Sequence, residues 1–174
     1  RIMTWTPEEG VVELHASSGV VYQPVVSGDR VAWAAYDSSG TVLTWTPSTG
    51  IVQISPVGTG YELDLSGDTV VWLGDDGGHL DIYAWMPGSG TIRVTDREFN
   101  HGEVSEPRTS GGRVIWSAIG GAGQGDDWEL FTWAPGMAEP TQVTSNDFHD
   151  GQPEITGDRI AWCGGGTGPS SAQS

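Results

Sequence analysis

Apolar and polar residues alternate with a period of two along most of the chain. Stretches such as Arg30–Ala34 and Thr41–Thr46 carry β-branched or aromatic residues at regular intervals, which is the pattern of a half-buried β-strand. Gly or Pro interrupts every window long enough for a helix, and both residues disfavour helix interiors. The sequence therefore predicts an all-β protein made of short strands.

Two tryptophan patterns recur along the chain and divide it into units. A Gly-x-x-Val/Ile-x-Trp pattern ends at Trp33, Trp72, Trp116 and Trp162, and a Trp-x-Pro pattern begins at Trp5, Trp45, Trp85 and Trp133. The spacings within the two series run from 39 to 48 residues. Eight of the nine tryptophans belong to these series, which indicates an internal repeat.

Each repeat is expected to hold four strands. In the first complete repeat these strands cover Tyr22–Val26, Arg30–Ala34, Thr41–Thr46 and Ile51–Ser55. Gly28-Asp29 predicts a two-residue hairpin turn, because glycine adopts positive φ freely. Four-stranded units that repeat every 40 to 48 residues predict a β-propeller, in which each four-stranded sheet is one blade. We assign residues 1–164 to this single domain and residues 165–174 to a flexible Gly/Ser-rich tail.

The repeats resemble those of a known family. The segment Ser27–Trp33 (SGDRVAW), and Asp81–Trp85 (DIYAW) followed by Thr91–Thr95 (TIRVT), are similar to the TolB-type propeller repeat of exported bacterial and archaeal proteins. The resemblance implies a propeller and a secreted, periplasmic or cell-surface location. It implies no particular activity, since the scaffold serves binding modules and enzyme-associated domains alike. Gly112 departs from the pattern, in which an aspartate is usual.

The two ends of the sequence match complementary halves of one blade. Ile2–Thr6 and Val11–Leu14 are in phase with third and fourth strands, whereas Gln152–Ile155 and Arg159–Cys163 are in phase with first and second strands. We therefore predict about four blades, the last completed by pairing of the N- and C-terminal strands, which would remove two exposed sheet edges. This arrangement describes a closed monomer. The alternatives are a fragment of a larger propeller, and a dimer that completes an eight-bladed ring.

Charge narrows the classes of partner. Seven arginines and no lysine stand against 23 acidic residues, for a net charge of −16. Nucleic acids and anionic membranes require a basic face, so the composition argues against both and favours a protein partner or a small cationic ligand. No apolar run reaches the roughly 20 residues that span a bilayer. A single cysteine, Cys163, excludes a framework of internal disulfides.

Strand order assigns every predicted loop to one of two faces. All four histidines fall on one face together with most loop carboxylates; they are His15, His79, His101 and His149. On this face Asp75, Asp76 and Asp81 are the candidate ligands for Ca²⁺, which takes six to eight oxygen atoms from flexible loops. No spacing matches an EF-hand or an H-E-x-x-H zinc motif. The simpler interpretation, which we favour, is that acidic Gly-rich loops keep the protein soluble.

The first strands of the blades are expected to line the channel. Their alignment places Val25, Asp64, Arg108 and Glu154 at one level, and Gln23, Glu62, Glu106 and Gln152 at another. Arg108 would lie between the carboxylates of Asp64 and Glu154. We favour an ion-paired, hydrated plug over a binding site for a small cation. The four tryptophans that end the first pattern are expected to be buried between blades rather than to stack on sugars.

These observations predict an exported, acidic propeller that is not an enzyme and acts as a binding, scaffold or assembly module. The sequence has no G-x-S-x-G elbow, and Cys163 is expected to be a small buried residue of an alternating strand. The alternative function is a propeller enzyme or enzyme-associated domain, such as a saccharide lyase or hydrolase. Its site would be built from scattered residues such as His101, His149 and Arg108.

Overall fold

The computed structural model describes residues 1–36, 40–55, 60–75, 78–95, 103–119 and 127–166. These residues form sixteen β-strands and contain no α-helix, so the all-β prediction is confirmed. Within the described part of the chain, no helix is long and apolar enough to cross a membrane.

Three four-stranded sheets follow one another along the chain, and we call them the first, second and third blades. The first blade consists of β3 (Val20–Ser27), β4 (Arg30–Tyr36), β5 (Thr41–Thr46) and β6 (Gly50–Gln53). The second consists of β7 (Gly60–Ser66), β8 (Thr69–Asp75), β9 (Leu80–Met86) and β10 (Gly90–Arg93). The third consists of β11 (Val104–Ser110), β12 (Arg113–Ile119), β13 (Trp128–Trp133) and β14 (Thr141–Gln142). Strands that are consecutive in the sequence pair antiparallel, so each blade is a meander.

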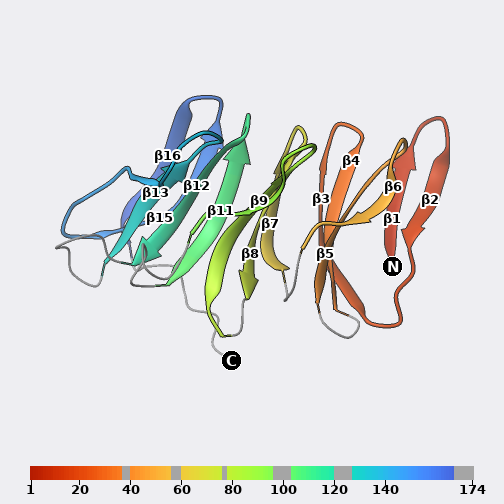
Figure 1. Ribbon diagram of the computed structural model, residues 1–174, viewed down its shortest axis with the longest axis horizontal. Coiled ribbons are helices and arrows are strands. Elements are labelled where there is room, and N and C mark those ends of the chain that lie inside the picture. The colour runs from red at the N-terminus through yellow and green to blue at the C-terminus, as the bar shows by residue number, and fades with distance from the viewer. Residues whose placement is uncertain (37–39, 56–59, 76–77, 96–102, 120–126, 167–174) are drawn as a thin grey trace.

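The remaining strands form two half-blades at opposite ends of the row (Figure 1). β1 (Ile2–Thr6) pairs with β2 (Gly10–His15), and β15 (His149–Thr156) pairs with β16 (Arg159–Gly166). No ladder joins β1 to β16, so the predicted completion of the last blade within one chain is wrong. The strands nevertheless amount to about four blades, as predicted. Ring closure depends on the angle between adjacent blades. The side chains packed between the blades determine this angle, and the period of the repeat contains no information about it.

The hairpins between first and second strands follow the predicted turn chemistry. Ser27 pairs with Arg30 across a two-residue turn, and the same register recurs in the two other blades and in the C-terminal half-blade. Gly28 has a φ of 55°, which a turn of the primed type requires at its first position. The fourth strand of the first blade ends at Gln53 rather than at Ser55. Its ladder stops there because the Ser55 hydroxyl accepts the Val42 N–H in place of a backbone carbonyl.

The apolar core lies between adjacent blades. Trp33, Trp72 and Trp116 are 0%, 1% and 0% exposed, as predicted, and each such burial contributes about 2–3 kcal/mol. Trp72 stacks on Tyr83, and Trp116 stacks on Phe131. Trp162 is 44% exposed, and Cys163 is exposed as well. The prediction of burial is wrong for these two residues because, among the described strands, none pairs with the other side of β16.

Candidate functional site

A bulge interrupts the inner strand of every blade and of the C-terminal half-blade, opposite a repeat tryptophan. In β3, Tyr22 pairs with Ala34 and Val25 with Ala32, so Gln23 and Pro24 together face Trp33. The same shift places two residues opposite each of Trp72, Trp116 and Trp162. The first residue of each bulge is left-handed: Gln23, Glu62, Glu106 and Gln152 have φ between 50° and 58°. The alignment that placed these four residues at one level is therefore confirmed.

Carboxylates of this bulge row connect neighbouring blades. The Glu106 backbone N–H donates to Glu62 Oε2 at 2.5 Å, and the Gln152 N–H donates to Glu106 Oε2 at 2.6 Å. A bulge leaves a backbone N–H without its ladder partner, and an unpaired buried N–H is costly. The side chain of one blade thus satisfies the backbone of the next. Sequence analysis missed this role, although three of the four residues precede proline, a repeated signal.

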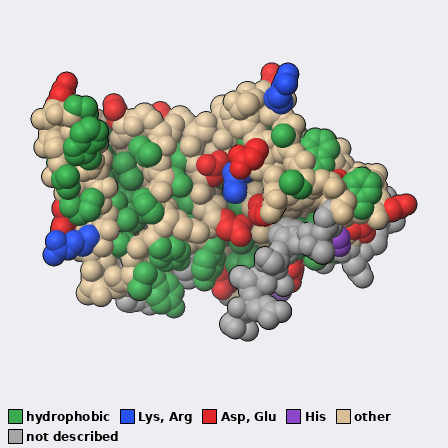
Figure 2. All heavy atoms as spheres, turned by 180° about the vertical axis from the view of Figure 1, so that it is seen from behind, with side chains coloured by type: hydrophobic (Ala, Val, Ile, Leu, Met, Phe, Trp, Pro, Cys, Tyr) green, Lys and Arg blue, Asp and Glu red, His purple; other side chains and the backbone are tan. Residues whose placement is uncertain are grey.

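The second level of the inner strands holds the predicted ionic residues. Arg108 Nε contacts Glu154 Oε1 at 3.4 Å, and the Glu154 side chain remains 74% exposed. Asp64 does not pair with Arg108; its Oδ2 accepts the Thr109 N–H at 2.7 Å. Among the described residues, Arg108 therefore has one acidic partner rather than the two predicted. Figure 2 shows acidic side chains gathered next to basic side-chain atoms near the middle of one face of the molecule.

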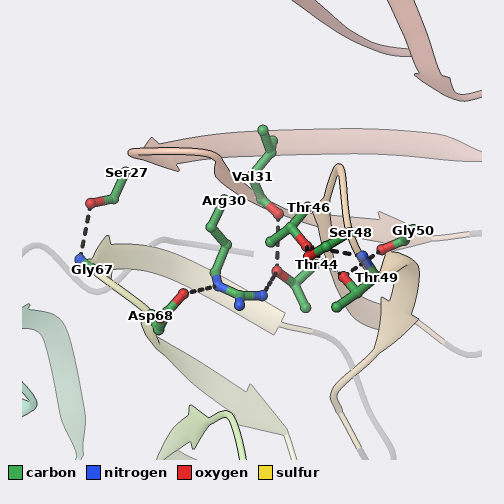
Figure 3. Close-up of polar contacts among 10 residues, drawn as sticks. All are labelled: Ser27, Arg30, Val31, Thr44, Thr46, Ser48, Thr49, Gly50, Gly67 and Asp68. Atoms are coloured by element: carbon green, nitrogen blue, oxygen red, sulfur yellow. Dashed lines mark hydrogen bonds and ion pairs between the residues drawn. The ribbon is translucent and has the colours of Figure 1, made fainter.

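A more buried ion pair joins the first blade to the second (Figure 3). Arg30 Nε donates to Asp68 Oδ1 at 2.9 Å, and Arg30 Nη1 donates to the Thr44 hydroxyl at 3.1 Å. The guanidinium also lies over the Trp85 ring, 4.9 Å from its centroid. In the next interface Thr69 and Gly112 occupy the positions of Arg30 and Asp68. Gly112 thus replaces the usual aspartate in the same interface in which Thr69 replaces the arginine that this aspartate would bind.

Two of the described histidines, His15 and His149, accept hydrogen bonds within the fold. His15 Nδ1 accepts the indole N–H of Trp33 at 3.0 Å, and His149 Nδ1 accepts the Trp128 backbone N–H at 3.0 Å. His15 ends β2 and His149 begins β15, while His79 precedes β9. Antiparallel strand order puts these three positions at the same edge of the sheets, as predicted. His101 lies outside the described residues.

The candidate calcium ligands are engaged in the fold where they are described. Asp81 is buried, its Oδ1 accepts the Thr95 hydroxyl at 2.9 Å, and its Oδ2 accepts Arg93 Nη2 at 2.5 Å. Asp75 Oδ1 accepts the Gly78 N–H at 2.7 Å, and Asp76 lies outside the described residues. Among the described residues, no three His, Cys, Asp or Glu side chains are grouped to hold a metal. Calcium binding by these aspartates stays a prediction.

Two carboxylates that the sequence assigned no role are completely buried in the C-terminal part. Glu129 accepts the Thr144 hydroxyl and the Asn146 N–H, at 2.5 and 2.8 Å. Asp150 accepts the Asn146 amide at 2.7 Å and the Trp162 indole N–H at 3.0 Å. Asn146 thus ties the third blade to the C-terminal half-blade. Asp150 lies in β15 and is buried by packing between blades, which the sequence pattern does not reveal.

Tyr22 of β3 lies at the contact between the first and second blades. Burial raises the pKa of the Tyr22 phenol, and Tyr61 and Tyr36 add smaller effects in the same direction. Its hydroxyl donates to the Gly60 carbonyl at 3.2 Å. Tyr22 is therefore a further contact between the first and second blades rather than an acid or base.

Comparison with known proteins rests on structure alone. No protein-family model matches the sequence, and no curated protein matches it. The chain is similar to TolB from Agrobacterium tumefaciens, with 16% identity and a TM-score of 0.59 over 79% of this chain and 50% of that one. It is also similar to the β-propeller domain of the Trilobed protease from Pyrococcus furiosus, which has an open velcro topology; identity is 12% and the TM-score 0.64, over 94% and 54% of the chains.

A peptidase gives a third match of the same quality. Acylaminoacyl peptidase of Pyrococcus horikoshii shares 13% identity, with a TM-score of 0.64 over 90% of this chain and 26% of that one. The chain has a β-propeller fold. It spans about half or about a quarter of the length of these structures. At these identities the similarity of this propeller concerns the fold, and the TolB-type resemblance of its repeats agrees with it.

Proposed function

We propose that this propeller is an exported, non-catalytic binding module whose inner strands recognise a cationic segment of a protein partner. The observation that carries the proposal is the row of acidic side chains on adjacent inner strands: Glu62, Asp64 and Glu106, which accept backbone N–H groups, and Glu154, which contacts Arg108. Propeller inner strands surround the channel where ligands of this fold have access. A cationic side chain would there meet several carboxylates at once.

Glu154 is the member of the row best suited to meet a ligand. Its side chain is 74% exposed and its contact with Arg108 is long, at 3.4 Å. A guanidinium from a partner can bind a carboxylate with two parallel hydrogen bonds, which the present contact does not use. The net charge of −16 would also accelerate the approach of a basic partner.

Two further observations support a non-catalytic role and export. His15, His149 and Asp81, which a catalytic site could use, instead accept hydrogen bonds that hold the strands together. The resemblance of the repeats to those of exported proteins supports a secreted, periplasmic or cell-surface location.

Binding can be tested with two cationic probes. We expect a fluorescent oligo-arginine peptide to bind the chain, measured by fluorescence anisotropy, with at least about tenfold lower affinity in about 500 mM than in about 50 mM NaCl. The polyamine spermidine serves as the small-cation probe, and competition between the two shows whether they share a site. Glu154→Gln should weaken peptide binding about threefold or more, because it removes an exposed carboxylate of the inner row.

The matched control is Glu139→Gln, which removes the same charge from an exposed position outside the inner strands. Its peptide affinity should equal that of the unmodified chain. Equal weakening by both substitutions would indicate attraction to the overall charge and would contradict an inner-strand site. Spermidine binding without peptide binding would replace the protein partner with a small cation.

A further inference from the structure

The half-blades expose residues at positions that the complete blades bury. Trp162 of β16 is 44% exposed, whereas its three counterparts are at most 1% exposed. Trp5 of β1 is 64% exposed, against 6% for its counterpart Trp133. Val26 of β3 is 70% exposed, whereas Leu65 at the same position of the second blade is 8% exposed. At these three positions apolar side chains are exposed where the described strands of this chain provide no neighbour.

The two exposed surfaces have complementary strand edges. β16 occupies the second-strand position and β1 the third-strand position. Among the described strands, no third strand lies beside β16 and no second strand lies beside β1. In each complete blade these two positions pair antiparallel, as β4 pairs with β5. The chain therefore contains three internal examples of what fits against each edge.

We propose that β16 of one copy pairs with β1 of a second copy, so that two half-blades combine into one complete blade. The registers of the three complete blades agree with one another and specify this contact. Ile160, Ala161, Trp162 and Cys163 would lie opposite Trp5, Thr4, Met3 and Ile2 of the second copy. This assembly is independent of the proposed cation-binding function.

Charge complementarity favours a second copy over an unrelated partner. Arg159 occupies the position of Arg30, and Asp29 occupies the position of Asp68. Inside the chain Arg30 reaches from the first blade to Asp68 and Trp85 of the second, as Figure 3 shows for the ion pair. Arg159 would likewise reach Asp29 and Trp45 of the second copy. The contact between copies would repeat the interface between the first and second blades.

The bulge row supports the same neighbour. Glu62 binds the N–H of Glu106, and Glu106 binds the N–H of Gln152. Gln152 is next in this series, and its exposed side chain has no hydrogen-bond partner among the described residues. In the assembly its amide oxygen would accept the N–H of Gln23 of the second copy, the first residue of the series.

The contact is head to tail, because it joins different surfaces of two identical chains. Such contacts form a closed ring or an open fibre, depending on the rotation between copies. Two copies supply about eight blades, which is within the usual range of propellers. The proposal is a ring of two copies with two identical composite blades.

Disulfide trapping tests the register. Val42 directs its N–H and its carbonyl toward the β6 side of the sheet, so Val42 and Ala34 form a non-hydrogen-bonded pair, whose side chains are closest. Ile2 and Cys163 hold these positions across the proposed contact. The Ile2→Cys chain should therefore form an intermolecular disulfide with native Cys163, seen as a covalent dimer on non-reducing gels.

Ile2 is buried, so a second pair keeps the test valid if that variant misfolds. Thr4→Cys with Ala161→Cys, in a Cys163→Ser background, should also crosslink. The matched control is Thr4→Cys with Glu139→Cys in the same background. Glu139 is exposed and lies between β13 and β14 of the third blade, outside β1 and β16. Crosslinking of the control at the same rate would overturn the proposal.

Light scattering after size exclusion tests the ring. We expect twice the 18.4 kDa mass of one chain, and a monomer for Met3→Pro, which removes an N–H directed at the free edge of β1. Ile51→Pro is the control: Ile51 lies at the outer edge of a complete blade opposite Trp45, and this variant should stay a dimer. A monomer at all concentrations, or mass that grows without limit as concentration rises, would overturn the ring of two copies.

Discussion

At the scale of single residues, the four bulge residues have a left-handed backbone conformation that glutamate and glutamine seldom adopt. They are Gln23, Glu62, Glu106 and Gln152. A left-handed φ at a non-glycine residue costs about 1–3 kcal/mol, and a hydrogen bond to a charged acceptor contributes about 1.5–3 kcal/mol. In Glu106 and Gln152 the two effects nearly cancel, because each bulge N–H donates to a carboxylate of the preceding blade. The strain is tolerated because it orients a contact between blades.

This balance predicts different costs for substitutions at equivalent positions. Glu62→Ala should lower the free energy of unfolding by about 1–3 kcal/mol, because it leaves the Glu106 N–H unpaired. Gln23→Ala should change it by less than about 0.5 kcal/mol, as exposed side chains without contacts generally do. Urea denaturation of the two variants measures both values. Equal effects would mean that the carboxylate contact contributes nothing to stability.

The sequence predicted the level of these residues but not their contacts. Alignment of the repeats was sufficient to place Glu62 and Glu106 side by side, because the bulge occurs at the same point of each inner strand. The partner of each carboxylate is a backbone N–H freed by the bulge, and no pattern of side chains reveals that group. The burial of Asp81 and Asp150 was not predicted for a related reason, since neighbouring strands cover them.

At the scale of strands and blades, the sequence was most informative where periodicity and turn chemistry agree. The third strand of the first blade was predicted over Thr41–Thr46, and the structure has the same bounds. Agreement ended where a side chain substitutes for the backbone, as Ser55 does at the end of β6. Burial of the repeat tryptophans was predicted for four positions and holds for the three that have a complete blade around them.

The tryptophans therefore predict a contrast between complete and half-blades. Trp72→Ala should lower the free energy of unfolding by about 3–5 kcal/mol, as truncation of a buried aromatic residue does. Trp162→Ala should cost about 1–2 kcal/mol, mainly because Asp150 loses the indole donor. Both substitutions should be made in the Met3→Pro variant, so that association between copies does not contribute to the measured free energy of unfolding. Equal costs in thermal unfolding would mean that β16 is covered within a single chain.

At the scale of the whole molecule, the sequence repeat does not predict the number of blades per ring. The complementary half-blades predict that the N- and C-terminal strands pair with each other. We predicted this pairing within one chain. The half-blades instead stand at opposite ends of the row (Figure 1). Large side chains such as Trp72 and Trp116 fill the space between adjacent blades, and their packing determines how sharply the row turns. A pattern of residue types carries no such angle.

Overall charge predicts how salt affects the folded chain. The net charge of −16 is expected to make repulsion outweigh the attraction of the ion pairs in the described residues, and salt screens repulsion between charges farther apart than about one Debye length, roughly 8–10 Å. Raising NaCl from about 10 to about 500 mM should therefore raise the free energy of unfolding by about 1 kcal/mol, a shift of about 2–4 °C in Tm. KCl should act equally, because screening depends on ionic strength.

Millimolar Ca²⁺ at fixed ionic strength separates this general effect from a specific site. Since Thr95 and Arg93 already occupy the oxygens of Asp81, we expect no rise in Tm beyond that caused by NaCl. Asp81→Asn should lower the free energy of unfolding by about 1–3 kcal/mol, equally with and without Ca²⁺, because it weakens a buried hydrogen-bonded ion pair. A Ca²⁺-dependent rise that saturates, and that Asp81→Asn abolishes, would instead assign a calcium site to Asp75, Asp76 and Asp81.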